Sequence, residues 1–159
     1  MEGVRPSGRL LPSLLSIHSL RSERYSMASP LTKGIHHLGL TVSRLEESAA
    51  FFKSMLGWHE VKRRDDYPAI FVSDGTVMLT LWATKEAPVT PFDKNRNVGL
   101  HHVAFTVPDE ATLNSVYERL QQAGAPIEFA PEPLGGGPAK HLICYDPSGI
   151  RVEILWPGP

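Results

Sequence analysis

The chain has 159 residues, of which 42% are hydrophobic and 21% are charged, a composition typical of one globular domain or of two small modules sharing a core. A formal net charge of −1 gives no reason to expect nucleic acid as a partner. No apolar run approaches the ~20 residues that cross a membrane. Cys144 is the only cysteine, which excludes an internal disulfide, favours a cytoplasmic location and argues against a cysteine-based metal site.

The N-terminal segment, residues 1–32, is predicted to be a disordered extension. Its first 26 residues hold four arginines, several serines and leucines, and only two acidic residues. A targeting peptide has a composition of that kind. We favour the simpler interpretation, an extension that arises from an early start codon, because Met27 lies directly before the domain.

A first module is predicted over residues 33–84, beginning with a strand at Ile35–Val42. Within its stretch HLGLTV, leucine and valine alternate with histidine, glycine and threonine, so one strand face is apolar and the other is polar. Ser43 and Glu46 are predicted to form a capping box for the following amphipathic helix, which ends at Gly57. Strands are then expected at 58–64, 69–73 and 76–83.

The same order repeats after a linker at residues 85–98, in a second module over residues 99–157. Its first strand is predicted at Leu100–Val107, within the stretch GLHHVAFTV that repeats the GIHHLGLTV of the first module. Asp109 is predicted to cap the second helix and Gly124 to end it. Three more strands are expected near 126–130, 139–145 and 150–156. The sequence therefore predicts an α+β fold in which two βαβββ modules pair into an open cup-shaped sheet, since each module alone has too little core.

The polar strand faces of the two modules indicate a metal site. His37 in the first module and His102 in the second occupy equivalent positions on the face opposite the helix. Glu153, on the last predicted strand, would be costly to bury alone, and a cation would offset that cost. Two imidazoles and one carboxylate suit a divalent ion such as Fe, Mn, Ni, Co or Zn, with positions left open for substrate.

An internal alignment suggests that the site has three protein ligands. When Gly75 is aligned with Gly149, the stretch TVMLTLW falls on IRVEILW. This alignment matches Leu79 with Glu153, so the first module offers no second carboxylate. It also matches Trp82 with Trp156, which we interpret as core residues.

These motifs resemble the vicinal oxygen chelate superfamily, also called the glyoxalase/bleomycin-resistance/dioxygenase superfamily, over about residues 33–157. Its opening motif is a ligand histidine followed by apolar residues three and five positions later, which selects the second histidine of each His-His pair. Its closing motif, DP-x-G…E, fits four residues of this chain: Asp146, Pro147, Gly149 and Glu153.

The resemblance implies an enzyme in which two neighbouring substrate oxygens chelate the metal ion. We expect a glyoxalase-like lyase or isomerase that acts on a small oxygenated molecule. The alternatives are a single-domain extradiol-type ring-cleaving dioxygenase and a metal-free binding or resistance protein. Leu79 departs from the fourth ligand of glyoxalase I, and Ile143 departs from the tyrosine of the extradiol dioxygenases and fosfomycin transferases, so no subgroup matches cleanly.

Further side chains are expected around the metal. If Ile143 faces the cup, so do His141 and Tyr145. We predict catalytic roles for Glu153, for His141 as an acid or base, and for Tyr145 as a hydrogen-bond donor to substrate. Arg151 either balances an anionic substrate or lies at the rim of the cup.

The other two histidines of the His-His pairs, His36 and His101, lie on the opposite strand face and are interpreted as structural. The two modules either close one cup within the chain or exchange between two chains. We expect a homodimer that binds a small molecule and has neither nucleic acid nor membrane as a partner.

Overall fold

The computed structural model describes residues 29–159, and residues 34–159 form one compact unit. The extension predicted over residues 1–32 lies almost entirely outside the described part. Within residues 29–159, no helix has both the length and the apolar character that a membrane crossing requires.

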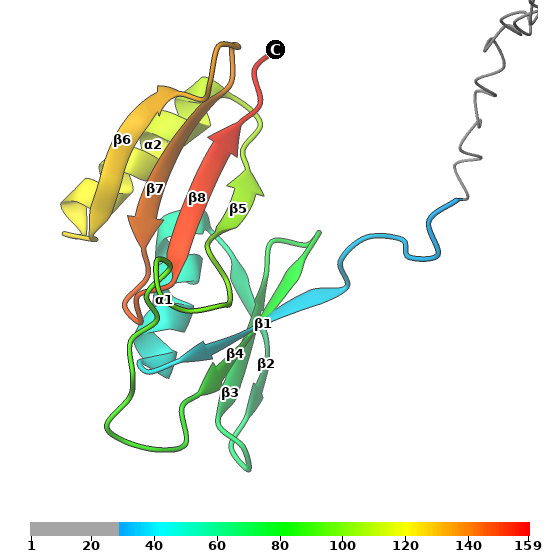
Figure 1. Cartoon of the computed structure of the whole chain (residues 1–159), viewed down its shortest axis with the longest axis vertical. Helices are drawn as coiled ribbons and strands as arrows, with labels where there is room; N and C mark the ends of the chain where they lie inside the picture. The colour runs from blue at the N-terminus through cyan, green and yellow to red at the C-terminus, as the bar shows by residue number, and fades with distance from the viewer. Residues whose placement is uncertain (1–28) are drawn as a thin grey trace, which may run out of the picture. The chain divides into compact units, whose positions relative to one another are not determined.

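The first module follows the predicted order strand, helix, three strands (Figure 1). Its elements are β1 (His37–Val42), α1 (Leu45–Leu56), β2 (His59–Arg64), β3 (Ala69–Ser73) and β4 (Met78–Ala83). They form a four-stranded sheet of order β1-β4-β3-β2, in which β1 and β4 are parallel and the other neighbours are antiparallel.

The second module repeats this architecture after a stretch without helix or strand, into which the predicted linker falls. Its elements are β5 (Val103–Thr106), α2 (Glu110–Gln122), β6 (Ile127–Pro133), β7 (Lys140–Tyr145) and β8 (Arg151–Trp156). The sheet order is β5-β8-β7-β6, with β5 parallel to β8. The α+β fold of two βαβββ modules with open sheets is therefore confirmed.

The alternation predicted for the first strand decides which face enters the core. Leu40 and Val42 are buried, whereas Gly39 and Thr41, which alternate with them, are exposed. Both modules contribute to one hydrophobic core, in which the rings of Trp58 and Phe105 lie 4.9 Å apart. Burial of apolar surface shared between the modules explains why neither is expected to be stable alone.

Cys144 belongs to this core as a small buried hydrophobic residue. It is 1% exposed, and burial raises the pKa of its thiol to about 12. A thiol with such a pKa is protonated at neutral pH, so Cys144 is not a nucleophile in the folded chain.

The two helices begin differently, which corrects one prediction. The residue preceding α1 is Arg44, which makes no side-chain capping bond, so Ser43 and Glu46 form no capping box. The Arg44 guanidinium instead binds Glu47 in the first turn. By contrast, Asp109 caps α2 as predicted, because its carboxylate accepts a hydrogen bond from the Thr112 amide at 2.7 Å.

The strand register corrects the internal alignment of the two modules. Glu153 lies opposite Ala104 of β5, and Gly39, the counterpart of Ala104, lies opposite Thr80 of β4. Thr80 is therefore the structural equivalent of Glu153, whereas Leu79 faces the core and is fully buried. The first module has one more residue between its turn glycine and the paired position, and a shift of one residue moves every side chain to the opposite face.

The same shift separates the two tryptophans that the alignment matched. Trp82 lies opposite Thr41, on the face away from the core, and contacts the rings of Tyr67 and Phe71. Trp156 packs against the core. The two residues therefore have different surroundings.

Candidate functional site

The candidate site is centred on Glu153, a buried carboxylate in the middle of β8. The Asp146 carboxylate sets the start of this strand, because its Oδ1 accepts hydrogen bonds from the Ser148 and Ile150 amides at 2.9 and 2.8 Å. This turn is the DP-x-G motif of the sequence. Two positions into the strand, Glu153 lies opposite Ile143 of β7, on the sheet face away from the helix.

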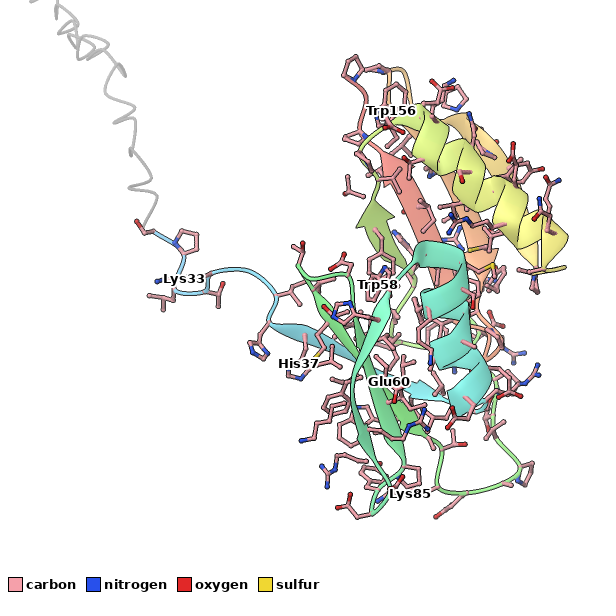
Figure 2. All side chains as sticks on the ribbon, turned by 180° about the vertical axis from the view of Figure 1, so that it is seen from behind. Lys33, His37, Trp58, Glu60, Lys85 and Trp156 are labelled. Atoms are coloured by element: carbon pink, nitrogen blue, oxygen red, sulfur yellow. The ribbon has the colours of Figure 1, made fainter. Side chains whose placement is uncertain are left out.

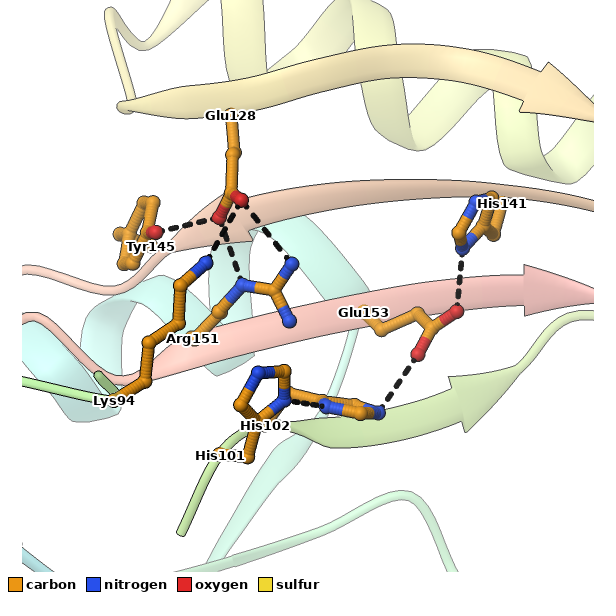
Figure 3. A network of polar contacts seen from close by, with 8 residues as sticks. All are labelled: Lys94, His101, His102, Glu128, His141, Tyr145, Arg151 and Glu153. Atoms are coloured by element: carbon orange, nitrogen blue, oxygen red, sulfur yellow. Dashed lines mark hydrogen bonds and ion pairs between the residues drawn. The ribbon is translucent and has the colours of Figure 1, made fainter. Parts of the chain in front are cut away.

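Two imidazoles contact this carboxylate from different sides (Figure 3). His102 Nε2 lies 3.0 Å from one oxygen of Glu153, and His141 Nδ1 lies 2.6 Å from the other. The Glu153 side chain is only 10% exposed, so these two contacts replace most of the water that would solvate its charge. The structure thus brings together three of the predicted site residues.

His102 precedes β5, which begins one residue later at Val103 and is shorter than predicted. Its Nδ1 lies 2.7 Å from Nδ1 of His101, so the two rings share a hydrogen bond while Nε2 of His102 points at Glu153. The first module repeats this arrangement, with 2.9 Å between Nδ1 of His36 and Nδ1 of His37. Such a contact fixes the orientation of an imidazole.

His37 lies at the first position of β1 (Figure 2). Within residues 29–159, no three histidine, cysteine, aspartate or glutamate side chains lie close enough together to hold one metal ion. The structure therefore does not bring His37 to His102 and Glu153 within one chain. The assignment of these three residues as metal ligands remains a prediction.

The residues that do meet fit a divalent cation. A buried carboxylate facing an imidazole nitrogen is the pairing of donors that such ions take in proteins. His141 on the far oxygen of Glu153 matches the hydrogen-bond partners that orient ligand carboxylates. A third donor and open positions for substrate would complete the site.

A second polar cluster lies on the same sheet face, centred on Glu128 of β6 (Figure 3). The Glu128 carboxylate accepts hydrogen bonds from Tyr145 Oη at 2.5 Å, Arg151 Nε at 2.7 Å and Lys94 Nζ at 2.9 Å. The Arg151 guanidinium, followed by the Tyr145 hydroxyl and Lys94, holds the pKa of Glu128 well below its usual range. Tyr145 is therefore bound to Glu128 in this structure, away from Glu153.

Sequence reasoning missed Glu128 and Lys94. Lys94 lies in the stretch between the modules, 34 residues before its partner. No local pattern links two charges so far apart, and the pairing of β6 with β7 is irregular next to Glu128. Only the charge of Arg151, already singled out, could have suggested a carboxylate partner.

A pocket of about 420 Å³ adjoins this second cluster. Its walls come from β1, from the stretch between β4 and β5, and from the start of β8. The residues that line it include Gly39, Thr41, Phe92, Lys94, Tyr145 and Arg151.

Comparison with known protein families identifies the superfamily of this chain. Residues 34–154 match the family model described as Glyoxalase/Bleomycin resistance protein/Dioxygenase superfamily. The chain belongs to this superfamily, which includes glyoxalases, dioxygenases and resistance proteins and whose members use divalent metal ions. The resemblance read from the His-His strands and the DP-x-G…E motif is thereby confirmed.

Individual relatives also come from more than one group of this superfamily. The protein YqjT of Bacillus subtilis is 29% identical over 77% of this chain and 98% of its own length. Catechol-2,3-dioxygenase of Bacillus subtilis is 34% identical over 59% of this chain, but the match spans only 33% of that enzyme. Among solved structures, a glyoxylase/bleomycin resistance protein/dioxygenase domain from Frankia has a TM-score of 0.70 and 27% identity, covering 79% of this chain and 98% of that one.

Proposed function

We propose that the protein is a divalent-metal-dependent lyase or isomerase that acts on a small oxygenated molecule. One observation carries this proposal, namely that Glu153 is buried between the imidazoles of His102 and His141. A buried carboxylate held in this way is costly to maintain without a functional reason. Membership of a superfamily that includes metal-using enzymes supports the same proposal.

The side chains at this site have different roles in the proposal. His102 Nε2 and Glu153 Oε2 face each other and would hold the metal ion. When bound, a divalent ion supplies Lewis-acid polarisation of two neighbouring substrate oxygens. His141 contacts Oε1 of Glu153. In this proposal the same imidazole takes or returns a proton at the site.

The third ligand in this proposal, His37, comes from a second copy of the chain. A two-fold dimer places equivalent residues of both copies at each of two shared sites. One copy then supplies His102 and Glu153, and its partner supplies His37. A homodimer thereby accounts for the separation of His37 from the other two residues within one chain.

A ring-cleaving dioxygenase is the second candidate, favoured by the 34% identity to catechol-2,3-dioxygenase. In the structure, Ile143 lies directly opposite Glu153. The extradiol dioxygenases usually carry a tyrosine at that position, and isoleucine offers no hydroxyl there. Because of this departure, we favour a lyase or isomerase reaction over ring cleavage.

The proposal is tested by the metal content of the full-length protein purified without chelators, alongside His37→Ala and Glu153→Ala. We expect about one ion per chain in the wild type and a loss of at least about tenfold in metal affinity in both variants. His59→Ala is the matched control, since it removes an exposed imidazole from β2 of the same module and should keep most of the metal.

Failure to take up Fe, Mn, Ni, Co or Zn by a correctly folded wild type would overturn the metal site. Metal uptake followed by oxygen consumption with catechol would favour the dioxygenase over the lyase or isomerase. An oxygen electrode makes that distinction directly.

A further inference from the structure

The pocket beside the Glu128 cluster and the proposed metal site share strand β8. Arg151, in its wall, is two residues before Glu153 on β8, so both side chains leave the same face of the sheet. Two residues along a strand span about 7 Å. Tyr145 lies opposite Arg151 in the register and extends the wall onto β7. A small molecule could therefore reach from one site to the other.

The pocket wall is cationic. Lys94 and Arg151 line it, and none of the described residues in its wall is acidic. Glu128 is not part of the wall, and it balances only one of the two permanent positive charges. Arg151 uses Nε and one terminal nitrogen on Glu128, which leaves further N–H groups of its guanidinium for another acceptor.

Part of the pocket wall is apolar. Val89 and Phe92 line it, and both are among the large hydrophobic side chains that the chain leaves exposed, at 42% and 45%. Leu100 and Ile150 add further apolar surface to the wall. A compact apolar group placed here would cover surface that is otherwise in contact with water.

We propose that this pocket binds an organic carboxylate, with the carboxylate on Lys94 and Arg151 and a compact apolar body against Val89 and Phe92. A planar carboxylate matches the fork of a guanidinium, and its single negative charge matches the one positive charge that Glu128 leaves unbalanced. The volume of about 420 Å³ is that of a site for a small molecule. This assignment rests on the proposed function, in which the pocket holds the end of the substrate that is remote from the metal.

Phenylacetate and phenylacetamide are suitable probes, because they have the same shape and differ in charge. Isothermal titration calorimetry on the full-length chain, with and without EDTA, measures their binding. We expect phenylacetate to bind at least about tenfold more tightly than the amide, and to do so equally well in EDTA. Equal affinity for both probes, or loss of phenylacetate binding in EDTA, would overturn the proposal, the latter because the probe would then sit on the metal.

Two variants locate the probe. Lys94→Met, in a stretch outside the sheets, should weaken phenylacetate binding by about five- to tenfold. Lys85→Met is the matched control, since Lys85 lies over the Tyr67 ring and does not line this pocket. Glu128→Gln should tighten binding about threefold, because a carboxylate that competes for Arg151 is lost. Unchanged binding in Lys94→Met, or weaker binding in a folded Glu128→Gln protein, would overturn the assignment.

The outcome is separable from that of the metal proposal. Phenylacetate binding in a protein that takes up no metal would support the proposal for the pocket and contradict the proposal for the metal site. Metal uptake without phenylacetate binding would do the reverse.

Discussion

Glu128 shows how one carboxylate can bring together side chains from separate parts of the chain. It collects the charges of Lys94 and Arg151 and the hydroxyl of Tyr145, three groups from different parts of the chain. Its side chain is 29% exposed, so water screens these interactions and their net contribution to stability stays within about 1 kcal/mol. What they fix is the direction in which Arg151 points.

The stability of the protein should depend on the ionisation of Glu128. Arg151 lowers its folded-state pKa below the ordinary value of 4.5. The ionised Glu128 therefore adds stability at a pH above 4.5, and this contribution is lost as the pH falls through the folded-state pKa. We expect Glu128→Gln to lose less stability between pH 6 and pH 3 than the wild type, by about 3 °C in the thermal midpoint.

Thermal unfolding followed by circular dichroism at the two pH values checks this prediction. Glu118→Gln, the same change at an exposed position on α2, is the control and should follow the wild type. An equal loss in the wild type and in Glu128→Gln would show that the cluster does not perturb this carboxylate.

At the scale of elements, the two modules use the same order of helix and strands but different local contacts. Helix α2 begins with a side-chain cap from Asp109, and α1 begins without one. Both helices are followed by a glycine with positive φ, at Gly57 and Gly124. A turn of this kind favours glycine because it has no Cβ, so the ends of both helices were readable from the sequence.

Removing the two candidate caps should therefore have unequal effects. Asp109→Ala should lower the free energy of unfolding by about 1 kcal/mol, since it leaves the Thr112 amide without its partner. Ser43→Ala should change it by less than about 0.5 kcal/mol, because Ser43 caps nothing. Urea denaturation measures both values. A loss of stability in Ser43→Ala equal to that in Asp109→Ala would show that Ser43 does cap α1.

At the scale of the whole molecule, the proposed metal site depends on how two copies of the chain associate. One compact unit holds both modules, with a shared core. The same unit keeps His37 away from His102 and Glu153. A two-fold dimer that exchanges these residues would create two equivalent sites, each built from both copies.

Mixing two inactive variants tests this arrangement. His37→Ala and Glu153→Ala each lose every complete site when alone. After subunit exchange, half of the dimers should be mixed, and each mixed dimer should hold one complete site, which restores about a quarter of the wild-type metal content. Metal analysis of the exchanged sample measures this fraction. No recovery after verified exchange would mean that all ligands come from one chain.

Several features of this protein follow from the sequence alone because they are local or periodic. The alternation in HLGLTV predicts which face of β1 is buried, and glycines mark the helix ends. The repeated His-His strands and the closing DP-x-G…E motif predict the superfamily, which the family model confirms. The sequence predicted that His37, His102 and Glu153 hold one metal ion, and of these the structure brings His102 and Glu153 into direct contact.

Other features were decided only by the tertiary structure. The equivalence of Thr80 and Glu153 depends on strand register. One extra residue after the turn glycine shifts this register, although the two aligned sequences still match at Leu-Trp. The contact between Lys94 and Glu128 joins residues 34 positions apart, and the pocket beside it needs three separate segments to meet. Alternation and turns are set by neighbours along the chain, whereas register and long-range contacts are set by packing of the whole core, so only the folded molecule shows them.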